Sequence, residues 1–474
     1  MTRFLPVMTL CAALATCSQA PTLLEEVRLL GELRVLTSES PTTFYQGPRG
    51  PMGPEFELAR GFAQFLGVAL QMDSVEQFHE LLPRVEIGRA HMAAAGLTVT
   101  NQRSLRVTFG PAYQTVTQHV VYRRGTRRPR SVQDLVGKKV EVIAASSFAE
   151  RLRGLQQEAP DLVFTENPAA DVAELLVAVN ERHIDYTVAD SNQFEIYRNL
   201  APEIRPGLML AERDDLAWAF PRRDNSLIRE AERYIEFINK SGELKRILDR
   251  YYGHTGQFDY VGTRRLIRDY GAKLPDYRPM FEDAAAAIGM DWRLLAAIGY
   301  QESLWDPDAV SPTGVRGIMM LTEKTADYIG VEDRVDPAQS IAGGADYISR
   351  MKARFAEIRE PDRTWFALAA YNIGYAHVQD ARALTRDQGL NADAWVHVRE
   401  HFEKLSQARW YRQTRHGYAP GWEPVRYVEN VRNYYDILVW LTLKESGESE
   451  PEPEDGDEPL TVAAARSATI NETG

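Results

Sequence analysis

The chain has 474 residues, which is enough for two or three domains with sizeable hydrophobic cores. Hydrophobic residues make up 44% and charged residues 26%, the composition of an ordinary soluble globular protein. The formal net charge of −12 at pH 7 excludes nucleic acid as a general partner, because binding to its phosphates requires a basic surface.

The N-terminus has the pattern of a processed segment. Arg3 precedes a short apolar run, 4–15, which is too short to span a bilayer as a helix. The run Leu14-Ala15-Thr16-Cys17 resembles a bacterial lipoprotein cleavage box, so we expect 1–17 to be a signal peptide whose Cys17 becomes the lipidated first residue. Ordinary secretory cleavage after Ala20, leaving a soluble periplasmic protein, is the alternative. The only other cysteine is Cys11, so the lipidated chain would have no thiol for a disulfide.

Residues 22–253 alternate short β-rich runs with helical segments, which predicts an α/β domain with largely parallel sheets. The predicted strands are 33–36, 139–144 and 186–189. The predicted helices are 57–66, 148–157 and a long stretch over 227–252.

This segment resembles the periplasmic solute-binding proteins of the polar amino-acid-binding type. The resemblance rests on Gly96-Leu97-Thr98-Val99-Thr100 followed by Arg103, on Ser146-Ser147 before a helix, and on the strand Asp185 to Asp190. It implies that Arg103 clamps a ligand carboxylate, that Asp190 receives an amino group, and that Thr98 and Ser147 complete the site for a muropeptide or amino-acid-like ligand. A planar guanidinium pairs well with a carboxylate, but a structural ion pair is the alternative role for Arg103 and Asp190.

The same resemblance implies two lobes. We expect 31–118 together with 217–253 to form one lobe, and 119–216 to form the inserted second lobe. The crossings near 120–121 and 216–220 would then be hinges that let the lobes close on a ligand.

Helical periodicity dominates the rest of the chain. Residues 254–277 are interpreted as a linker that packs on one or both domains, because it contains Tyr260, Leu266 and Ile267. A mostly-α domain is expected over 278–445, and the acidic, apolar-poor segment 446–474 is expected not to fold. The predicted helices are 280–288, 292–303, 322–329, 340–355, 365–371, 395–404 and 425–443.

The most informative helix is 292–303. Glu302 continues the apolar stripe of Leu295 and Ile298, and burial there would raise the pKa of its carboxyl toward the range of a general acid. Pro307 disfavours helix at the residue before it, so the helix should end just after Glu302. A solvated glutamate at a helix end is the alternative reading.

Two segments around this glutamate resemble the lytic transglycosylases with a goose-type-lysozyme-like domain. The first is Glu302-Ser303 followed by 311–322, and the second is 370–374. The resemblance implies a lysozyme-like fold in which one glutamate first protonates the bond between N-acetylmuramic acid and N-acetylglucosamine. The same glutamate then takes the proton of the muramic C6 hydroxyl, which gives a 1,6-anhydro end. Glu302 is assigned both roles.

Other site residues follow from matching positions in the same motifs. Met320 stands where many members have Gln, which affects only the sugar contact that a Gln would make. The residues implied to line the glycan site are Ser303, Ser311, Gly317, Met319, Tyr371, Asn372 and Tyr427.

The chain as a whole therefore predicts an α/β two-lobed periplasmic solute-binding-protein-like domain followed by a mostly-α lysozyme-like domain. This order resembles the membrane-bound lytic transglycosylase F family. It implies an enzyme of the periplasmic face of the outer membrane that cleaves peptidoglycan glycan strands without a cofactor or metal and is held by its lipid anchor. Its N-terminal domain would sense a ligand and modulate activity. A hydrolytic muramidase, or a cell-wall sensor whose second domain only holds glycan, are the alternatives.

Overall fold

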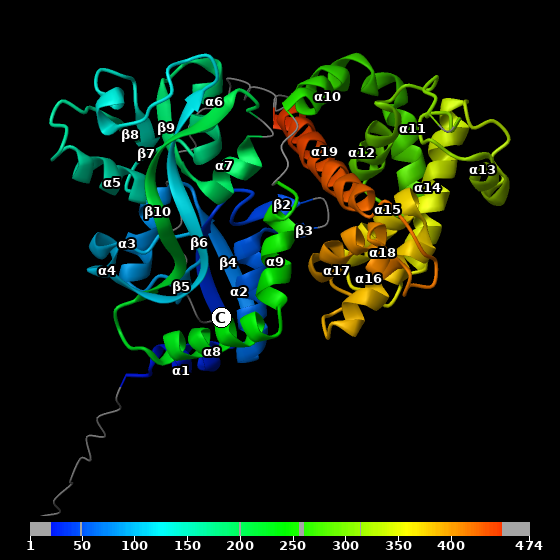
Figure 1. The fold of residues 1–474 in the computed structure, drawn as a ribbon. Helices are drawn as coiled ribbons and strands as arrows, with labels where there is room; N and C mark the ends of the chain where they lie inside the picture. The colour runs from blue at the N-terminus through cyan, green and yellow to red at the C-terminus, as the bar shows by residue number, and fades with distance from the viewer. Residues whose placement is uncertain (1–19, 48–49, 199–200, 256–259, 313, 448–474) are drawn as a thin grey trace, which may run out of the picture.

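The computed structural model describes residues 20–447, except 48–49, 199–200, 256–259 and 313. The predicted lipidation site, Cys17, and all but the first two residues of the predicted acidic tail lie outside these residues. Within them, an α/β unit and a helical unit lie side by side (Figure 1). None of the helices in this part of the chain is long and apolar enough to span a membrane.

The α/β unit is built on a six-stranded mixed sheet. Strand β1 pairs in parallel with β4 and β5, whereas β10 pairs antiparallel with β5 and β6, and β6 antiparallel with β9. The prediction of largely parallel sheets was therefore wrong for the half of the sheet formed by β10, β6 and β9. The order is β4 (Ala69–Val75), β1 (Glu32–Ser38), β5 (Met92–Ala93), β10 (Ile204–Pro221), β6 (Val107–Arg123), β9 (Tyr186–Asp190).

Strands β6 and β10 are antiparallel because one carries the chain into the second lobe and the other brings it back. Both run through two hydrophobic cores: Val116 and Leu216 belong to the core of the first lobe, and Val120 and Val121 to that of the second (Figure 1). The chain crosses between the lobes within these two strands. In β10 it crosses before the predicted range 216–220, because Leu210 packs on the core of the second lobe, whereas Leu216, Trp218 and Phe220 already belong to that of the first.

The remaining elements of the α/β unit divide between the lobes. The first lobe has α1 (Leu23–Leu30), β2 (Tyr45–Gly47), β3 (Gly50–Met52), α2 (Pro54–Leu66), α3 (Leu81–Glu86), α4 (Asn101–Ser104), α8 (Ser226–Lys240) and α9 (Glu243–Tyr252). The second has β7 (Glu141–Ile143), α5 (Ser147–Leu155), β8 (Thr165–Asn167), α6 (Val172–Glu181) and α7 (Ser191–Tyr197).

The predicted single helical stretch over 227–252 is in fact two helices. Helix α8 ends before Ser241, and Gly242 has a φ of +76°, a left-handed conformation that glycine adopts without steric cost. The apolar periodicity continues on both sides of the turn, so the pattern alone did not reveal the break.

The helical unit follows the predicted pattern closely. All seven predicted helices are present, and α10, α16 and α18 are additional. Leu266 of α10 is fully buried in the core of this unit, so its packing begins within the segment interpreted as a linker. The elements are α10 (Tyr260–Ala272), α11 (Leu274–Ala287), α12 (Trp292–Ser303), α13 (Glu323–Ile329), α14 (Pro337–Ala353), α15 (Asp362–Ile373), α16 (Tyr375–Asp387), α17 (Trp395–Phe402), α18 (Ala408–Tyr411) and α19 (Trp422–Gly447).

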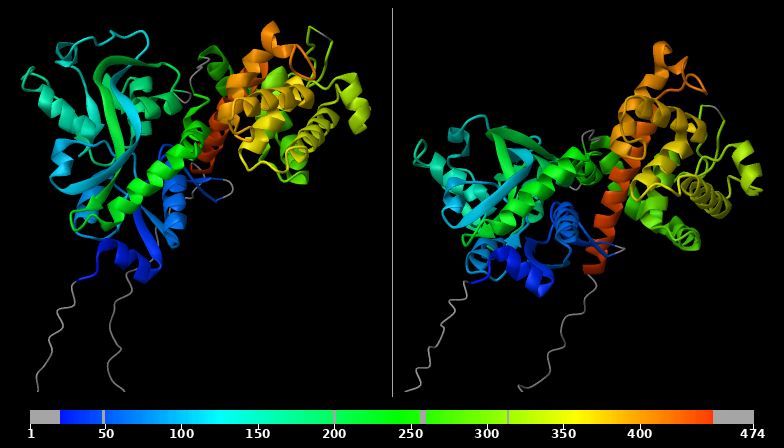
Figure 2. Two further views of the ribbon diagram at one scale, coloured as in Figure 1. Left: turned by 60° about the horizontal axis from the view of Figure 1, so that its bottom comes forward. Right: turned by 90° about the horizontal axis from the view of Figure 1, so that it is seen from below.

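Helix α9 of the first lobe joins the two units by contacting α17 and α19 (Figures 1 and 2). The buried Arg432 of α19 donates from Nη2 to the carbonyl oxygens of Asp249 and Arg250, at 2.8 and 2.9 Å. Arg246 of α9 forms a salt bridge of 2.8 Å with Asp362 of α15. Because a buried guanidinium is costly to leave unpaired, these contacts hold the units in one arrangement.

Candidate functional site

Glu302 lies on the last turn of α12, as predicted. The helix ends at Ser303, and the next two residues, Leu304 and Trp305, have left-handed φ values of 58° and 54°. The buried indole of Trp305 donates to the carbonyl oxygen of Ala296 at 2.8 Å, which fixes this sharp turn. The chain therefore leaves the helix abruptly, directly after the glutamate.

The carboxylate of Glu302 has one tyrosine as its hydrogen-bond donor. The hydroxyl of Tyr427, on α19, donates to Oε1 of Glu302 at 2.6 Å, and Tyr427 is itself buried. Burial raises the pKa of Glu302 to about 7, although the Tyr427 hydrogen bond favours the charged form and lowers it in part. Such a carboxyl holds its proton under conditions where an exposed glutamate has lost it, so it can act as an acid.

The loop 314–321, part of the motif segment 311–322, forms the wall beside this glutamate. Met319 is fully buried, and a Cβ on Gly344 of α14 would lie 2.6 Å from its Cε, so the helix has room for this side chain only because residue 344 is glycine. The carbonyl oxygen of Met319 accepts a hydrogen bond of 2.8 Å from the hydroxyl of Tyr371. The ring of Tyr371 in turn stacks on Tyr427, with centroids 6.5 Å apart and an angle of 18° between the planes.

Gly317 sets the path of this loop. Its φ is +88°, and a Cβ at this position would lie 1.9 Å from the carbonyl oxygen of Arg334. No side chain fits there, because a backbone carbonyl cannot move aside as a flexible side chain can.

The two predicted serines make backbone contacts in this structure. The Ser303 hydroxyl is buried, lies 2.8 Å from the carbonyl oxygen of Ile318 and accepts from the backbone N–H of Asp306. Ser311 Oγ accepts from the backbone N–H of Val315. Both serines therefore fix the loop around Glu302. Asn372, at the end of α15 next to Tyr371, is exposed.

The acids nearest to Glu302 in sequence are not directed at it by the fold. Asp306 and Asp308 are both exposed, and Oδ1 of Asp306 accepts the backbone N–H of Asp308 in a local turn. In the described part of the chain, the interactions that shift the pKa of Glu302 are burial and Tyr427. The site is thus arranged around one carboxyl group.

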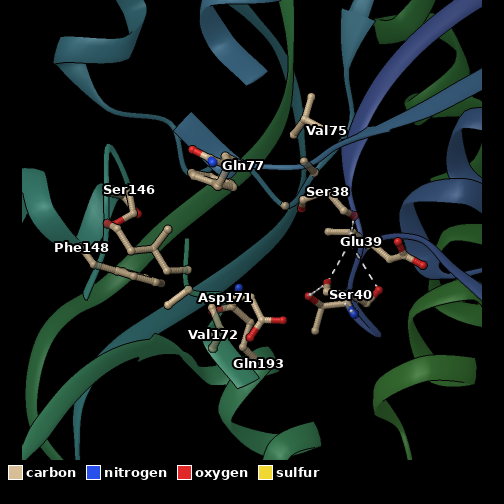
Figure 3. A pocket seen from close by; sticks show the side chains of 18 of the residues that line it. Ser38, Glu39, Ser40, Val75, Gln77, Ser146, Phe148, Asp171, Val172 and Gln193 are labelled. Carbon is tan, nitrogen blue, oxygen red and sulfur yellow. Dashed lines mark hydrogen bonds between the residues drawn. The ribbon is translucent and has the colours of Figure 1, made fainter. Parts of the chain in front are cut away.

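A second site lies between the lobes of the α/β unit. A cavity of about 350 Å³ opens there, lined by Ser38, Glu39, Ser40 and Gln77 of the first lobe and by Ser146, Phe148, Asp171 and Gln193 of the second (Figure 3). All four predicted ligand-binding residues, Thr98, Arg103, Ser147 and Asp190, line this cavity and are buried.

Arg103 already contacts the second lobe. Its Nε donates to Oε1 of Glu150 on α5 at 3.2 Å, and its Nη2 donates to the carbonyl oxygen of Ala145 at 3.2 Å. Its Nη1 donates to the carbonyl oxygen of Thr98 in its own lobe, also at 3.2 Å. Within the described part of the chain these bonds use three of its five N–H groups, which leaves one N–H on each terminal nitrogen. Glu150 was not predicted as a site residue from the sequence. The one available signal was its position one helical turn after Ser147.

Asp190 faces the cavity from the end of β9. Its Oδ1 accepts a hydrogen bond of 3.3 Å from Nε2 of Gln118 on the neighbouring strand β6. Burial raises the pKa of this carboxyl to about 7. A cationic group of a ligand would favour its charged form.

The described residues show no candidate metal site. Among them, no group of three or more His, Cys, Asp or Glu side chains is arranged to hold a metal ion.

Comparison with known families divides the chain in the same way as the fold. Residues 33–254 match the family described as bacterial extracellular solute-binding proteins, family 3. Residues 279–393 match the family described as the transglycosylase SLT domain.

Two curated relatives match over nearly the whole chain. The membrane-bound lytic murein transglycosylase F 1 of Alkalilimnicola ehrlichii is 50% identical over 424 residues, covering 89% of this chain and 86% of the relative. The membrane-bound lytic murein transglycosylase F of Saccharophagus degradans is 44% identical over 440 residues, covering 92% and 88%. Among solved structures, an ancestral arginine-binding protein bound to arginine is 22% identical, with a TM-score of 0.43, and covers 47% of this chain and 98% of its own.

We expect Gly317→Ala to destabilise the helical unit strongly, because the new Cβ adds a clash with the Arg334 carbonyl to a left-handed backbone conformation. Gly314→Ala is the matched control: Gly314 has a φ of +81°, but nothing lies within 4 Å of a Cβ there. The control should lose about 1–2 kcal/mol of unfolding free energy, the cost of the left-handed backbone conformation alone. Urea unfolding measures both variants, and equal losses of stability would show that the clash at residue 317 is relieved at no cost.

Proposed function

Since the chain belongs to the membrane-bound lytic murein transglycosylase F family, it is a peptidoglycan lytic transglycosylase with an N-terminal solute-binding domain, and we propose that Glu302 is its single catalytic acid and base. The observation that carries this proposal is the half-buried Glu302 carboxyl, with a pKa of about 7 and Tyr427 as its hydrogen-bond donor. The bond cleaved is the β-1,4 linkage between N-acetylmuramic acid and N-acetylglucosamine.

Each step of the proposed reaction conserves protons and uses no water. Glu302 gives its proton to the glycosidic oxygen, the bond from that oxygen to the muramic C1 breaks, and N-acetylglucosamine leaves with a free 4-hydroxyl group. The muramic C6 oxygen then bonds to C1, and its hydroxyl proton passes to the Glu302 carboxylate. This gives the 1,6-anhydro end and restores the acid for the next cycle.

Tyr427 supports both halves of this cycle. Its hydroxyl donates to Glu302 and so stabilises the carboxylate that exists after the first proton transfer. Tyr371, stacked on Tyr427 and bonded to the carbonyl of Met319, holds the wall of the site in place. Among the remaining predicted residues, the exposed Asn372 is accessible to a sugar, and Ser303, Ser311 and Gly317 keep the loop in position.

Hydrolysis is the alternative reaction, and the arrangement of acids argues against it. Most glycoside hydrolases place a second carboxylate on the far side of the scissile bond to activate water or attack the sugar. Asp306 and Asp308, the candidates nearest in sequence, are exposed and engaged in their own turn. The other alternative, a domain that only holds glycan, does not account for a carboxyl group with a pKa raised by burial.

The N-terminal domain is proposed to sense a small ligand with a carboxylate and an ammonium group, such as the peptide portion of a muropeptide. Support comes from the free N–H groups of Arg103 on one side of the cavity and the Asp190 carboxyl on the other. Because α9 ties the first lobe to α19, which carries Tyr427, closure of the lobes on a ligand would also modulate the catalytic site.

The chain is further proposed to be anchored through a lipidated Cys17 at the periplasmic face of the outer membrane. The cleavage-box pattern at 14–17 supports the anchor, and the relatives are named membrane-bound. A soluble periplasmic form cleaved after Ala20 is the alternative.

We expect Glu302→Gln to lower peptidoglycan turnover by about 10³-fold or more, because one group supplies both the acid and the base. Mass spectrometry of the digest of purified peptidoglycan is the measurement. The parent should release anhydro-muropeptides, and Glu332→Gln, an exposed glutamate of the same domain, should match the parent. Products with reducing ends would establish hydrolysis instead.

Activity should depend on pH through Glu302. The protonated acid is needed, so kcat/KM should fall as pH rises through about 7. Tyr427→Phe removes the donor that favours the carboxylate, so the pKa should rise and the alkaline limb of the profile should move to higher pH while the rate decreases. An alkaline limb that stays in place or moves to lower pH would contradict this role for Tyr427.

We expect Arg103→Ala to weaken binding of a disaccharide-tetrapeptide muropeptide by about 10- to 100-fold, the loss of charge-assisted hydrogen bonds worth roughly 1.5–3 kcal/mol. Arg106→Ala, which removes an exposed ion pair with Glu86, is the control. Calorimetry measures the affinity, and turnover is compared with and without the muropeptide. If affinity and turnover are both unchanged in Arg103→Ala, the sensing role has no basis.

A further inference from the structure

Large apolar side chains are exposed on three neighbouring helices, α1, α2 and α8, at the end of the α/β unit where the described chain begins. Leu29 and Leu30 of α1 are 80% and 51% exposed, Phe65 of α2 is 42% exposed, and Phe237 of α8 is 58% exposed. Helix α8 packs against both α1 and α2, and the rings of Phe65 and Phe237 lie 6.2 Å apart. The right view of Figure 2 looks onto these helices, and we call the surface formed by the four residues the α1–α8 face.

Helix α1 is a fixed part of the first lobe. Its Leu23 and Val27 are buried in the core of that lobe. The backbone N–H groups of Leu23 and Leu24 donate to the side chains of Asp224 and Ser226 at the start of α8, at 2.8 and 2.9 Å. The exposed leucines of α1 therefore have a definite orientation relative to Phe237.

The chain between Cys17 and α1 is short. It consists of residues 18–22, and the six steps from Cys17 to Leu23 reach about 20 Å when fully extended. If Cys17 carries a lipid, α1 cannot lie farther than this from the membrane surface. The α1–α8 face includes this helix, so the tether holds it near the bilayer.

We propose that the α1–α8 face docks on the membrane that holds the lipidated Cys17. The inference rests on the proposed lipidation, and adds a defined orientation to it. Apolar side chains on a surface helix insert among lipid head groups and add to the affinity of a covalent lipid. In Figure 1 the helical unit lies beside the α/β unit, away from α1.

Charge on this face is balanced, which gives the docking a distinctive property. Ion pairs join Arg223 to Glu26, Arg233 to Glu230 and Lys240 to Glu236. Because these positive charges are paired with negative ones, docking would depend on the apolar side chains and not on attraction to anionic lipids. It should therefore occur on neutral lipids and persist at high salt concentration.

Single-cysteine labelling of the full-length lipidated chain tests the proposal. The chain has only Cys11 and Cys17, so a new cysteine is the one free thiol of the mature protein. Lys240→Cys places a fluorophore one turn after Phe237 and leaves all four apolar residues intact. Val163→Cys, at an exposed position of the second lobe, is the matched control. Both are reconstituted in phosphatidylcholine vesicles that contain a lipid with a spin-labelled quencher near its head group.

We expect quenching at residue 240 and none at residue 163, with no loss in 1 M salt. Leu29→Lys combined with Leu30→Lys should abolish the quenching at 240 while the fraction of protein that floats with the vesicles stays the same. A protein that floats without quenching at 240 overturns the docking but keeps the anchor. A protein that does not float shows that the lipidation itself is wrong. Quenching that requires anionic lipid, or self-association through this face in place of quenching, also overturns the inference.

Discussion

The hydrogen bond from Tyr427 to Glu302 is the interaction on which the catalytic domain depends. A carboxyl group can serve as an acid near neutral pH when its pKa is raised, as burial does for Glu302, and burial of such a group is unfavourable unless it has a partner. Here the partner comes from α19, 125 residues farther along the chain. Tyr371 stacks on Tyr427 and donates to the carbonyl oxygen of Met319, so it holds the loop that carries Met319 against the same pair. The wall of the site is thus built around one hydrogen-bonded carboxylate.

Helix α19 extends this dependence to the other domain. Arg432 lies five residues after Tyr427 on this helix, and it binds the carbonyl groups at the end of α9 in the first lobe. A buried guanidinium bound to backbone oxygens does not exchange partners easily, since an unpaired charge in the interior is strongly unfavourable. One helix therefore connects Tyr427, the hydrogen-bond partner of Glu302, with the first lobe, which lines the cavity between the lobes.

Much of this architecture could be predicted from local patterns. The apolar stripe of α12 predicted that Glu302 lies on the buried face of this helix, and Pro307 predicted where the helix ends. Both signals depend only on residues a few positions apart. The break at Gly242, the antiparallel course of β6 and β10, and Glu150 as partner of Arg103 could not be predicted in this way. The strand course and the Glu150 contact are decided by packing between segments far apart in the chain, whereas at Gly242 the apolar periodicity continues past the local signal of the glycine. The roles of Ser303 and Ser311 as loop contacts likewise appeared only with the backbone in place.

The cavity between the lobes has a consequence for the chemistry of sensing. Burial raises the pKa of Asp190 to about 7, which favours its protonated form, whereas a ligand ammonium group favours the charged form. Binding of such a ligand would expel part of a proton into the surrounding solution, and the affinity would rise with pH across this range. In the proposed sensing role, the response would depend on the acidity of the surroundings as well as on the ligand, and the heat of binding would change with the ionisation enthalpy of the buffer.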